Sequence, residues 1–104
     1  MFRTLAGMAL ASAAAIAFPA QAQGSDPNAG RNLAAACANC HGTNGASVQG
    51  MPYLAGQQKS YLAERMQEFK AGKRPATIMH QIAKGYTDEQ IEALAAYFSA
   101  QKGK

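Results

Sequence analysis

The chain has 104 residues, of which 10 are Lys or Arg and 6 are Asp or Glu, and its formal net charge is +4. This length favours one domain over several. The basic residues are interleaved with acidic ones (Glu64, Glu68, Glu89 and Glu92) and form no long run, so the charge does not indicate a nucleic-acid-binding protein.

The first 22 residues have the features of a secretory signal peptide. Arg3 supplies a positive charge, residues 5–18 form an uncharged and mostly apolar run, and residues 20–22 (Ala-Gln-Ala) offer small side chains for cleavage. A transmembrane anchor is the alternative, but a span needs about 20 apolar residues and this run stops at Pro19. We therefore expect cleavage after residue 22, one domain over residues 23–104 without a transmembrane anchor, and export to the periplasm.

After the signal segment, helix signals are plentiful and strand signals are nearly absent. Asp26 and Pro27 form an N-cap and first-turn pair, which predicts a helix that runs toward the cysteines at 37 and 40. Gly30 lies inside this helix, where it costs roughly 1 kcal/mol relative to alanine and would permit the close approach of another helix. The glycine-rich stretch 42–56 then predicts a loop.

The second half of the chain predicts three more helices. Residues 57–71 carry an apolar stripe of Leu62, Met66 and Phe69, and a glycine and a proline follow them. A short helix fits residues 77–83. A last helix begins at a capping box and frays before Gly103; its N-cap is Thr87, its N3 residue is Gln90, and its buried face is Ile91, Leu94, Ala95 and Phe98. The sequence therefore predicts an all-α domain of roughly four helices and one long loop.

Cys37, Cys40 and His41 form a Cys-x-x-Cys-His motif, the attachment pattern of a c-type haem. Residues three apart on a helix lie on one face, so both sulfurs can reach the vinyl groups along one porphyrin edge, and His41 can bind the iron from one side. Four alternatives remain: a dithiol redox centre, a structural disulfide, an iron–sulfur cluster, and a zinc site that includes His80. The dithiol lacks a βαβ context, the cluster lacks two cysteines, and adjacent ligands suit a zinc tetrahedron poorly.

These segments, in this order, resemble a small bacterial class I cytochrome c over essentially the whole mature chain. The matching pieces are the early helix with Gly30, then "CANCHG", "MPYLAGQ", "YLAERMQEFKAGKRP" and "TIMHQIAKGYTDEQIEALAAYF". The middle and the end also resemble the cytochrome subunit of flavocytochrome c sulfide dehydrogenases and the related free periplasmic cytochromes. The resemblance implies the class I cytochrome c fold around a single haem c that is attached through Cys37 and Cys40.

Three methionines remain after signal cleavage as candidates for the second axial ligand. Met66 lies on an apolar helical stripe, which favours core packing. Met51 is close in sequence to His41 and belongs on the same side of the ring. Met79 is far enough along the chain to reach the other side, and it matches the ligand methionine of the family. His80 competes with it, but adjacent helical residues point about 100° apart, and we expect His80 at the surface.

The resemblance also assigns supporting roles around the haem. It implies that the carbonyl of Pro52 accepts a hydrogen bond from His41, and that Gly30 and Tyr97 meet where the first and last helices cross. Tyr53, Tyr61 and Tyr86 are candidates for lining the pocket or binding a propionate. Lys70, Lys73 and Arg74 form a basic group that is a solvated face, a propionate partner through Arg74, or a surface for an acidic redox partner.

The expected function is electron transfer without catalysis by the chain itself. Two versions stay open: a free periplasmic shuttle with redox partners such as a terminal oxidase, and the haem subunit of a flavin-containing sulfide dehydrogenase. A haem-based gas sensor or peroxidase-like enzyme is a further alternative, if the Met79 side of the iron is open.

Overall fold

The structure is a computed structural model that describes residues 7, 11–16 and 26–104. The predicted cleavage site after residue 22 lies outside these residues, as does most of the predicted signal peptide. Residues 11–16 are exposed and belong to no helix or strand. Across the described ranges, none of the helices has both the length and the apolar character needed to cross a membrane.

Every regular element within residues 26–104 is helical, which confirms the predicted all-α class. In chain order the elements are α1 (Ala29–Ala34), η1 (Ala35–Cys37), α2 (Ala38–His41), η2 (Thr43–Gly45), α3 (Lys59–Lys70), α4 (Met79–Ala83) and α5 (Asp88–Ser99). The first three follow one another without a break, and the linking residues keep right-handed helical angles. They form one helical segment with a 3₁₀ turn inside it, so residues 26–104 contain the four helices that were predicted, and η2 is an additional short 3₁₀ turn.

Three predicted helix starts were wrong by two residues, since α1, α3 and α4 begin at Ala29, Lys59 and Met79 and not at residues 27, 57 and 77. The carboxylate of Asp26 accepts a hydrogen bond from the backbone N–H of Asn28 at 2.8 Å, and this turn precedes α1. Gln58 is still extended, with ψ at 135°, so α3 begins only at Lys59. The capping box at α5 is confirmed, because Thr87 and Gln90 each accept a hydrogen bond from the backbone N–H of the other.

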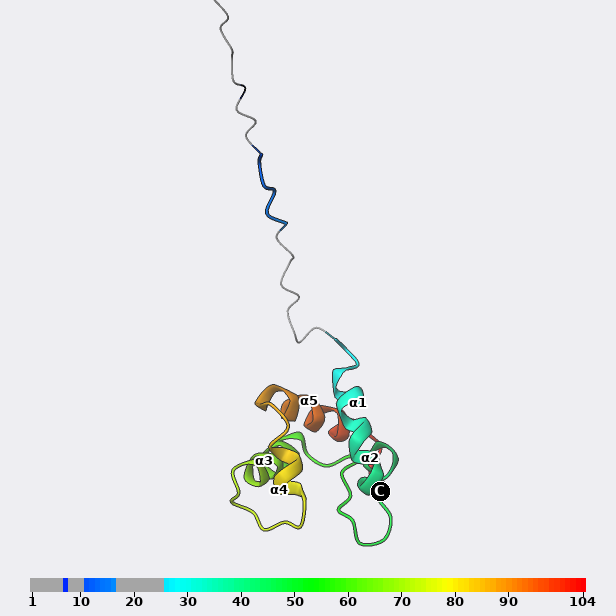
Figure 1. Ribbon diagram of the computed structural model, residues 1–104. Coiled ribbons are helices and arrows are strands. Elements are labelled where there is room, and N and C mark those ends of the chain that lie inside the picture. Colours follow the sequence, from blue (N-terminus) through cyan, green and yellow to red (C-terminus); the bar gives the residue numbers. More distant parts are fainter. Residues whose placement is uncertain (1–6, 8–10, 17–25) are drawn as a thin grey trace, which may run out of the picture.

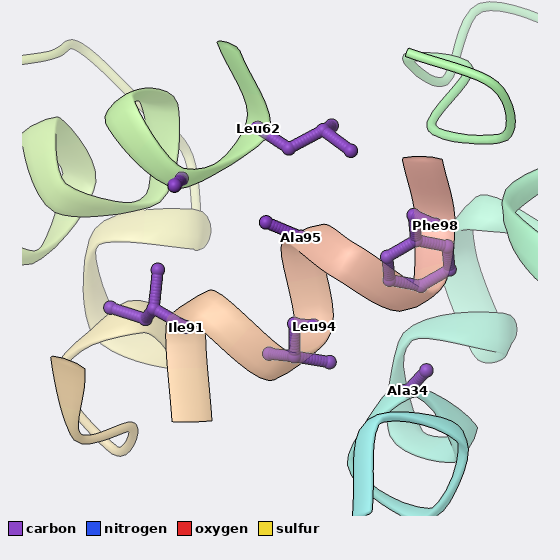
Figure 2. Close-up of a cluster of buried hydrophobic side chains, with 7 residues drawn as sticks. Ala34, Leu62, Ile91, Leu94, Ala95 and Phe98 are labelled. Atoms are coloured by element: carbon purple, nitrogen blue, oxygen red, sulfur yellow. The ribbon is translucent and has the colours of Figure 1, made fainter. Parts of the chain in front are cut away.

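Helix α5 is the centre of the packing, with α1 against it and α3 against it as well (Figure 1). Its predicted apolar face is confirmed. Figure 2 shows these side chains together with Leu62 of α3 and Ala34 of α1. The buried cluster consists of Ala34, Leu62, Ala63, Ile91, Leu94, Ala95 and Phe98. Several of its members are alanines, so the core is narrow, as expected for a domain of this size.

The crossing of α1 and α5 depends on a residue without a side chain. A Cβ atom on Gly30 would lie 2.7 Å from the carbonyl oxygen of Ala93 and 3.0 Å from the Cβ of Tyr97. The expected contact between Gly30 and Tyr97 is therefore confirmed. The missing side chain at Gly30 lets the backbones of α1 and α5 come into direct contact.

Ion pairs on the surface connect α3 to α5. Lys59 lies 3.4 Å from Glu92, and Lys70 lies 3.1 Å from Asp88. Such exposed pairs contribute at most about 1 kcal/mol each, so they guide the alignment of the helices while the apolar cluster stabilises it.

Candidate functional site

A cavity of about 600 Å³ lies beside the core and receives residues from α2, the loop at 51–57, α3, α4 and α5. Its lining is mostly apolar and includes Leu62, Leu94, Ala95 and Phe98 of the core itself. The structure places all five residues of the predicted site in this lining: Cys37, Cys40, His41, Pro52 and Met79. The fold therefore brings together predicted site residues that are separated by more than forty positions along the chain.

The two cysteines stand one helical turn apart on the cavity wall, and no disulfide joins them. Cys37 is half-buried and Cys40 is exposed. Burial, and then the proximity of Cys40, raises the pKa of the Cys37 thiol. A raised pKa disfavours the thiolate on which dithiol redox chemistry depends, so the microenvironment is unlike that of a thioredoxin-type centre.

His41 is the only buried polar side chain among the described residues, at 8% exposed. Its Nδ1–H donates a hydrogen bond to the carbonyl oxygen of Pro52 at 2.8 Å. A carbonyl can only accept, so this bond fixes the proton on Nδ1 and leaves the lone pair on Nε2. A histidine held in this way has a fixed ring orientation and one nitrogen ready for a metal ion.

The loop that carries Pro52 is fastened at several points. Its neighbour Leu54 donates a backbone hydrogen bond to the carbonyl of Gly45 at 2.9 Å, and Gly56 donates to the carbonyl of Phe98 at 2.9 Å. The hydroxyl of Ser47 donates to the carbonyl of Met51 at 2.7 Å. The loop is thus tied both to the turn after α2 and to α5, and the Pro52 carbonyl has a defined position opposite His41.

All three methionines of residues 26–104 line the cavity, but in different settings. Met51 is 41% exposed and precedes Pro52. Met66 packs against the apolar core from α3. Met79 is the first residue of α4 and is half-buried. His80 is not part of the lining, and it is partly buried instead of lying at the surface as expected.

The three candidate tyrosines also line the cavity, and so do two arginines. Tyr86 lies near Cys37: burial first, and then that thiol, raise the pKa of its phenol. The predicted basic group is divided, because Lys70 pairs with Asp88 while Arg74 pairs with Glu68 at 3.3 Å.

Sequence reasoning missed Arg65. It lines the cavity and pairs with Glu68 at 2.7 Å. Its position three residues after Leu62 and four before Phe69 was the available signal, since such spacing puts all three on one helical face.

Two observations show that this cavity suits a flat, mostly apolar cofactor with acidic groups. Apolar side chains that line it remain exposed, among them Tyr61 at 46% and Ile78 at 56%. Two arginines, Arg65 and Arg74, line it as well, and a guanidinium pairs well with a carboxylate. A haem would cover the first group and offers carboxylates to the second, and two cysteines with a buried histidine match the donors of a c-type haem.

Comparison with known proteins points the same way. The family model described as Cytochrome c matches residues 27–102. The cytochrome subunit of sulfide dehydrogenase from Chlorobaculum tepidum is 42% identical over 69 residues, which are 66% of this chain and 63% of that protein. Cytochrome c4 from Pseudomonas aeruginosa is 40% identical over 78 residues, 74% of this chain but 39% of that protein. The chain thus spans less than two thirds of the length of these relatives.

Cytochrome c-554(548) from Halomonas halodenitrificans is similar over nearly its whole length, with 36% identity over 81 residues that cover 74% of this chain and 98% of that protein. Among solved structures, reduced cytochrome c4 from Pseudomonas stutzeri matches with a TM-score of 0.71 and 37% identity, over 76% of this chain and 47% of that one. The family carries haem c bound covalently through a cysteine pair, which here is Cys37 and Cys40. With the motif, the helical fold and these matches in agreement, the chain belongs to the cytochrome c family.

Proposed function

We propose that this chain transfers single electrons between partner proteins in the periplasm, after removal of residues 1–22 as a signal peptide. The observation that carries the proposal is the hydrogen bond from His41 Nδ1 to the Pro52 carbonyl, inside a cavity that also contains Cys37, Cys40 and Met79. Bound haem c supplies an iron that takes up and releases one electron. The chain supplies the attachment, the axial ligands and an apolar surrounding.

The residues divide this work in a simple way. Cys37 and Cys40 hold the haem through thioether bonds. His41 binds the iron through Nε2, and the Pro52 carbonyl keeps its ring in place. Met79 would supply a second ligand, and a methionine ligand favours a high reduction potential. Arg74, which lines the cavity, would pair with a haem propionate.

The choice of Met79 among the three methionines follows from their surroundings. Met51 belongs to the loop that fixes His41, so it lies on the histidine side. Met66 packs into the core cluster, where its side chain already has apolar partners. Met79 comes from a separate helix, α4, that packs on α3. It is therefore the methionine best placed to reach the iron from the other side.

A second version of the function is favoured by the similarity to the sulfide dehydrogenase subunit of Chlorobaculum tepidum. In that version the chain is the non-catalytic haem subunit of a complex and receives electrons from a flavin-containing partner. In the first version it diffuses freely and delivers electrons to a partner such as a terminal oxidase. Purification of the native chain with or without a flavoprotein distinguishes the two.

The test of the proposed function is absorption spectroscopy of the chain matured with a haem-attachment system. We expect a c-type spectrum when reduced, a far-red sulfur-to-iron band when oxidised, and no change with carbon monoxide. Met79→Leu should remove the far-red band and open the iron to carbon monoxide. Met66→Leu and Met51→Leu are the matched controls, since each removes a sulfur that lines the same cavity, and both should keep the band.

Three results would contradict this assignment. A colourless protein would return the cysteines to dithiol chemistry. A haem protein that binds carbon monoxide without any mutation would favour the sensor or peroxidase reading. Loss of the far-red band in Met51→Leu or Met66→Leu, with Met79→Leu unchanged, would move the ligand to that methionine.

A further inference from the structure

Glu68 connects two arginines on the wall of the cavity. One carboxylate oxygen, Oε1, accepts from Nη2 of Arg65 at 2.7 Å, and the other, Oε2, accepts from Nη1 of Arg74 at 3.3 Å. Glu68 and Arg65 lie one turn apart on α3, whereas Arg74 follows the end of that helix. A single carboxylate therefore fixes a guanidinium from the helix and another from the connection that leads to α4.

This group differs from an ordinary surface ion pair. The side chains of Arg65 and Glu68 are only 25% and 29% exposed, and both arginines line the cavity. The pair of Lys59 on α3 and Glu92 on α5 provides the contrast, since both side chains are more than half exposed and neither lines the cavity. At the cavity wall two arginines thus share one half-buried carboxylate, while the other carboxylate near Arg65, that of Glu64, is 66% exposed.

Arg65 still has unused donors. Its Nη2 already serves Glu68 and, at 3.0 Å, Glu64. Its Nε is enclosed by the protein itself, so the donor that an acceptor in the cavity can reach is Nη1, which has no hydrogen-bond partner among the described residues. A guanidinium prefers a carboxylate as its partner. The unused Nη1 of an arginine that lines the cavity therefore suits a carboxylate in the cavity.

We propose that Arg65 is a second carboxylate-binding residue of the haem cavity, beside Arg74, and that it takes a haem propionate on Nη1. Glu68 is the positioning residue that keeps both guanidiniums at the wall. The proposal rests on the proposed function, because it requires haem in this cavity. Arg65 thereby fixes a propionate and raises the reduction potential, while the charge of Glu68 lowers it.

The signs follow from electrostatics. Reduction adds a negative charge at the iron, so a nearby cation favours the reduced protein and a nearby anion disfavours it. Removing the cation with Arg65→Gln should lower the reduction potential. Removing the anion with Glu68→Gln should raise it.

The experiment is a redox titration of the haem-loaded chain and its variants. Arg65→Gln is compared with Lys59→Gln, which removes a cation from the same helix and also breaks an ion pair with a glutamate. We expect the decrease in potential to be clearly larger for Arg65→Gln. Arg65→Lys keeps the charge but lacks the guanidinium, so its potential should fall between those of wild type and Arg65→Gln. Glu68→Gln is measured against Glu92→Gln in the same way, and should give the larger increase.

The outcomes separate this inference from the proposed function. A normal c-type spectrum with equal shifts for Arg65→Gln and Lys59→Gln would overturn the role of Arg65 and leave electron transfer intact. Full restoration of the wild-type potential by Arg65→Lys would overturn the assignment of the guanidinium as the donor. A wild-type chain without any c-type spectrum would contradict both proposals. If Arg65→Gln does not fold, an increase in Glu68→Gln no larger than that in Glu92→Gln overturns the inference by itself.

Discussion

Gly45 holds together the loop that orients His41, and its replacement by alanine measures how tightly that loop is packed. It is buried, and its φ of +79° lies in the left-handed region. An added Cβ would lie 2.8 Å from the Cβ of Leu54 and 2.8 Å from the Cδ1 of Phe98. The left-handed conformation costs a non-glycine residue about 1–2 kcal/mol, and overpacking adds about 1–3 kcal/mol.

The control for this variant is Gly50→Ala. Gly50 has nearly the same φ, +81°, but an added Cβ there would meet nothing within 4 Å. The strain and the effect of alanine on the unfolded chain are common to both variants, so the difference between them isolates the overlap with Leu54 and Phe98. We expect Gly45→Ala to lose about 3 kcal/mol of unfolding free energy and Gly50→Ala about 1 kcal/mol.

Thermal unfolding of the haem-loaded protein, followed by far-ultraviolet circular dichroism, measures this difference. In a domain of this size 1 kcal/mol corresponds to a shift in Tm of about 4–8 °C, so the two variants should differ by roughly 8–16 °C. Equal losses of Tm would refute the argument, because they would mean that the loop moves aside at no cost and does not fix the Pro52 carbonyl.

Three smaller predictions concern the scaffold. Thr87→Ala removes the side-chain acceptor of the α5 capping box and should cost about 1 kcal/mol in denaturant unfolding, whereas Thr87→Ser should retain most of it. Gly30→Ala should destabilise the chain despite the better helix propensity of alanine, because its Cβ would meet the backbone oxygen of Ala93 at 2.7 Å; a variant as stable as wild type would contradict the close helix crossing. The pKa of the Asp88 carboxyl is lowered from 3.8, first by a hydrogen bond from Gln67 and then by a lysine. The ionised carboxylate therefore stabilises the folded chain above pH 3.8, and this stabilisation is lost as the pH falls through the lowered pKa. Asp88→Asn should therefore be less stable than wild type at neutral pH and should lose this difference in acid, as paired denaturation curves would reveal.

Local signals in the sequence were sufficient for most of the fold. The capping box at Thr87 and the spacing from Ile91 to Phe98 both depend on neighbours within a few residues, and both predictions were confirmed. The helix starts at Asp26 and Gln57 were wrong, because more than one residue there could begin a helix and the choice depends on the turn that precedes it. The position of Met79 in the cavity wall follows from the packing of α4 on α3; its distance from His41 along the chain and the family resemblance both anticipated it.

The sequence did not predict which cation pairs with which carboxylate. Lys70 and Arg74 stand in one basic group along the chain, yet Lys70 pairs with Asp88 of α5 and Arg74 with Glu68 of α3. The choice depends on which carboxylate the tertiary fold brings near each cation. An ion pair between residues 18 positions apart has no local signature. Glu68 was therefore read as one of several interleaved acidic residues, although it links two arginines of the cavity wall.

The two sides of the cavity depend on different helices, and the core determines their separation. His41 is oriented by a loop that is hydrogen-bonded to α5 through Gly56 and Phe98. Met79, the proposed second ligand, belongs to α4, which packs on α3. Helices α3 and α5 meet in the buried cluster (Figure 2). Packing between these two helices therefore fixes the distance from the histidine side to the methionine side. A core of three alanines and four large apolar side chains is enough for this purpose, because it needs to hold only one helix crossing in place while the cofactor fills the adjoining cavity.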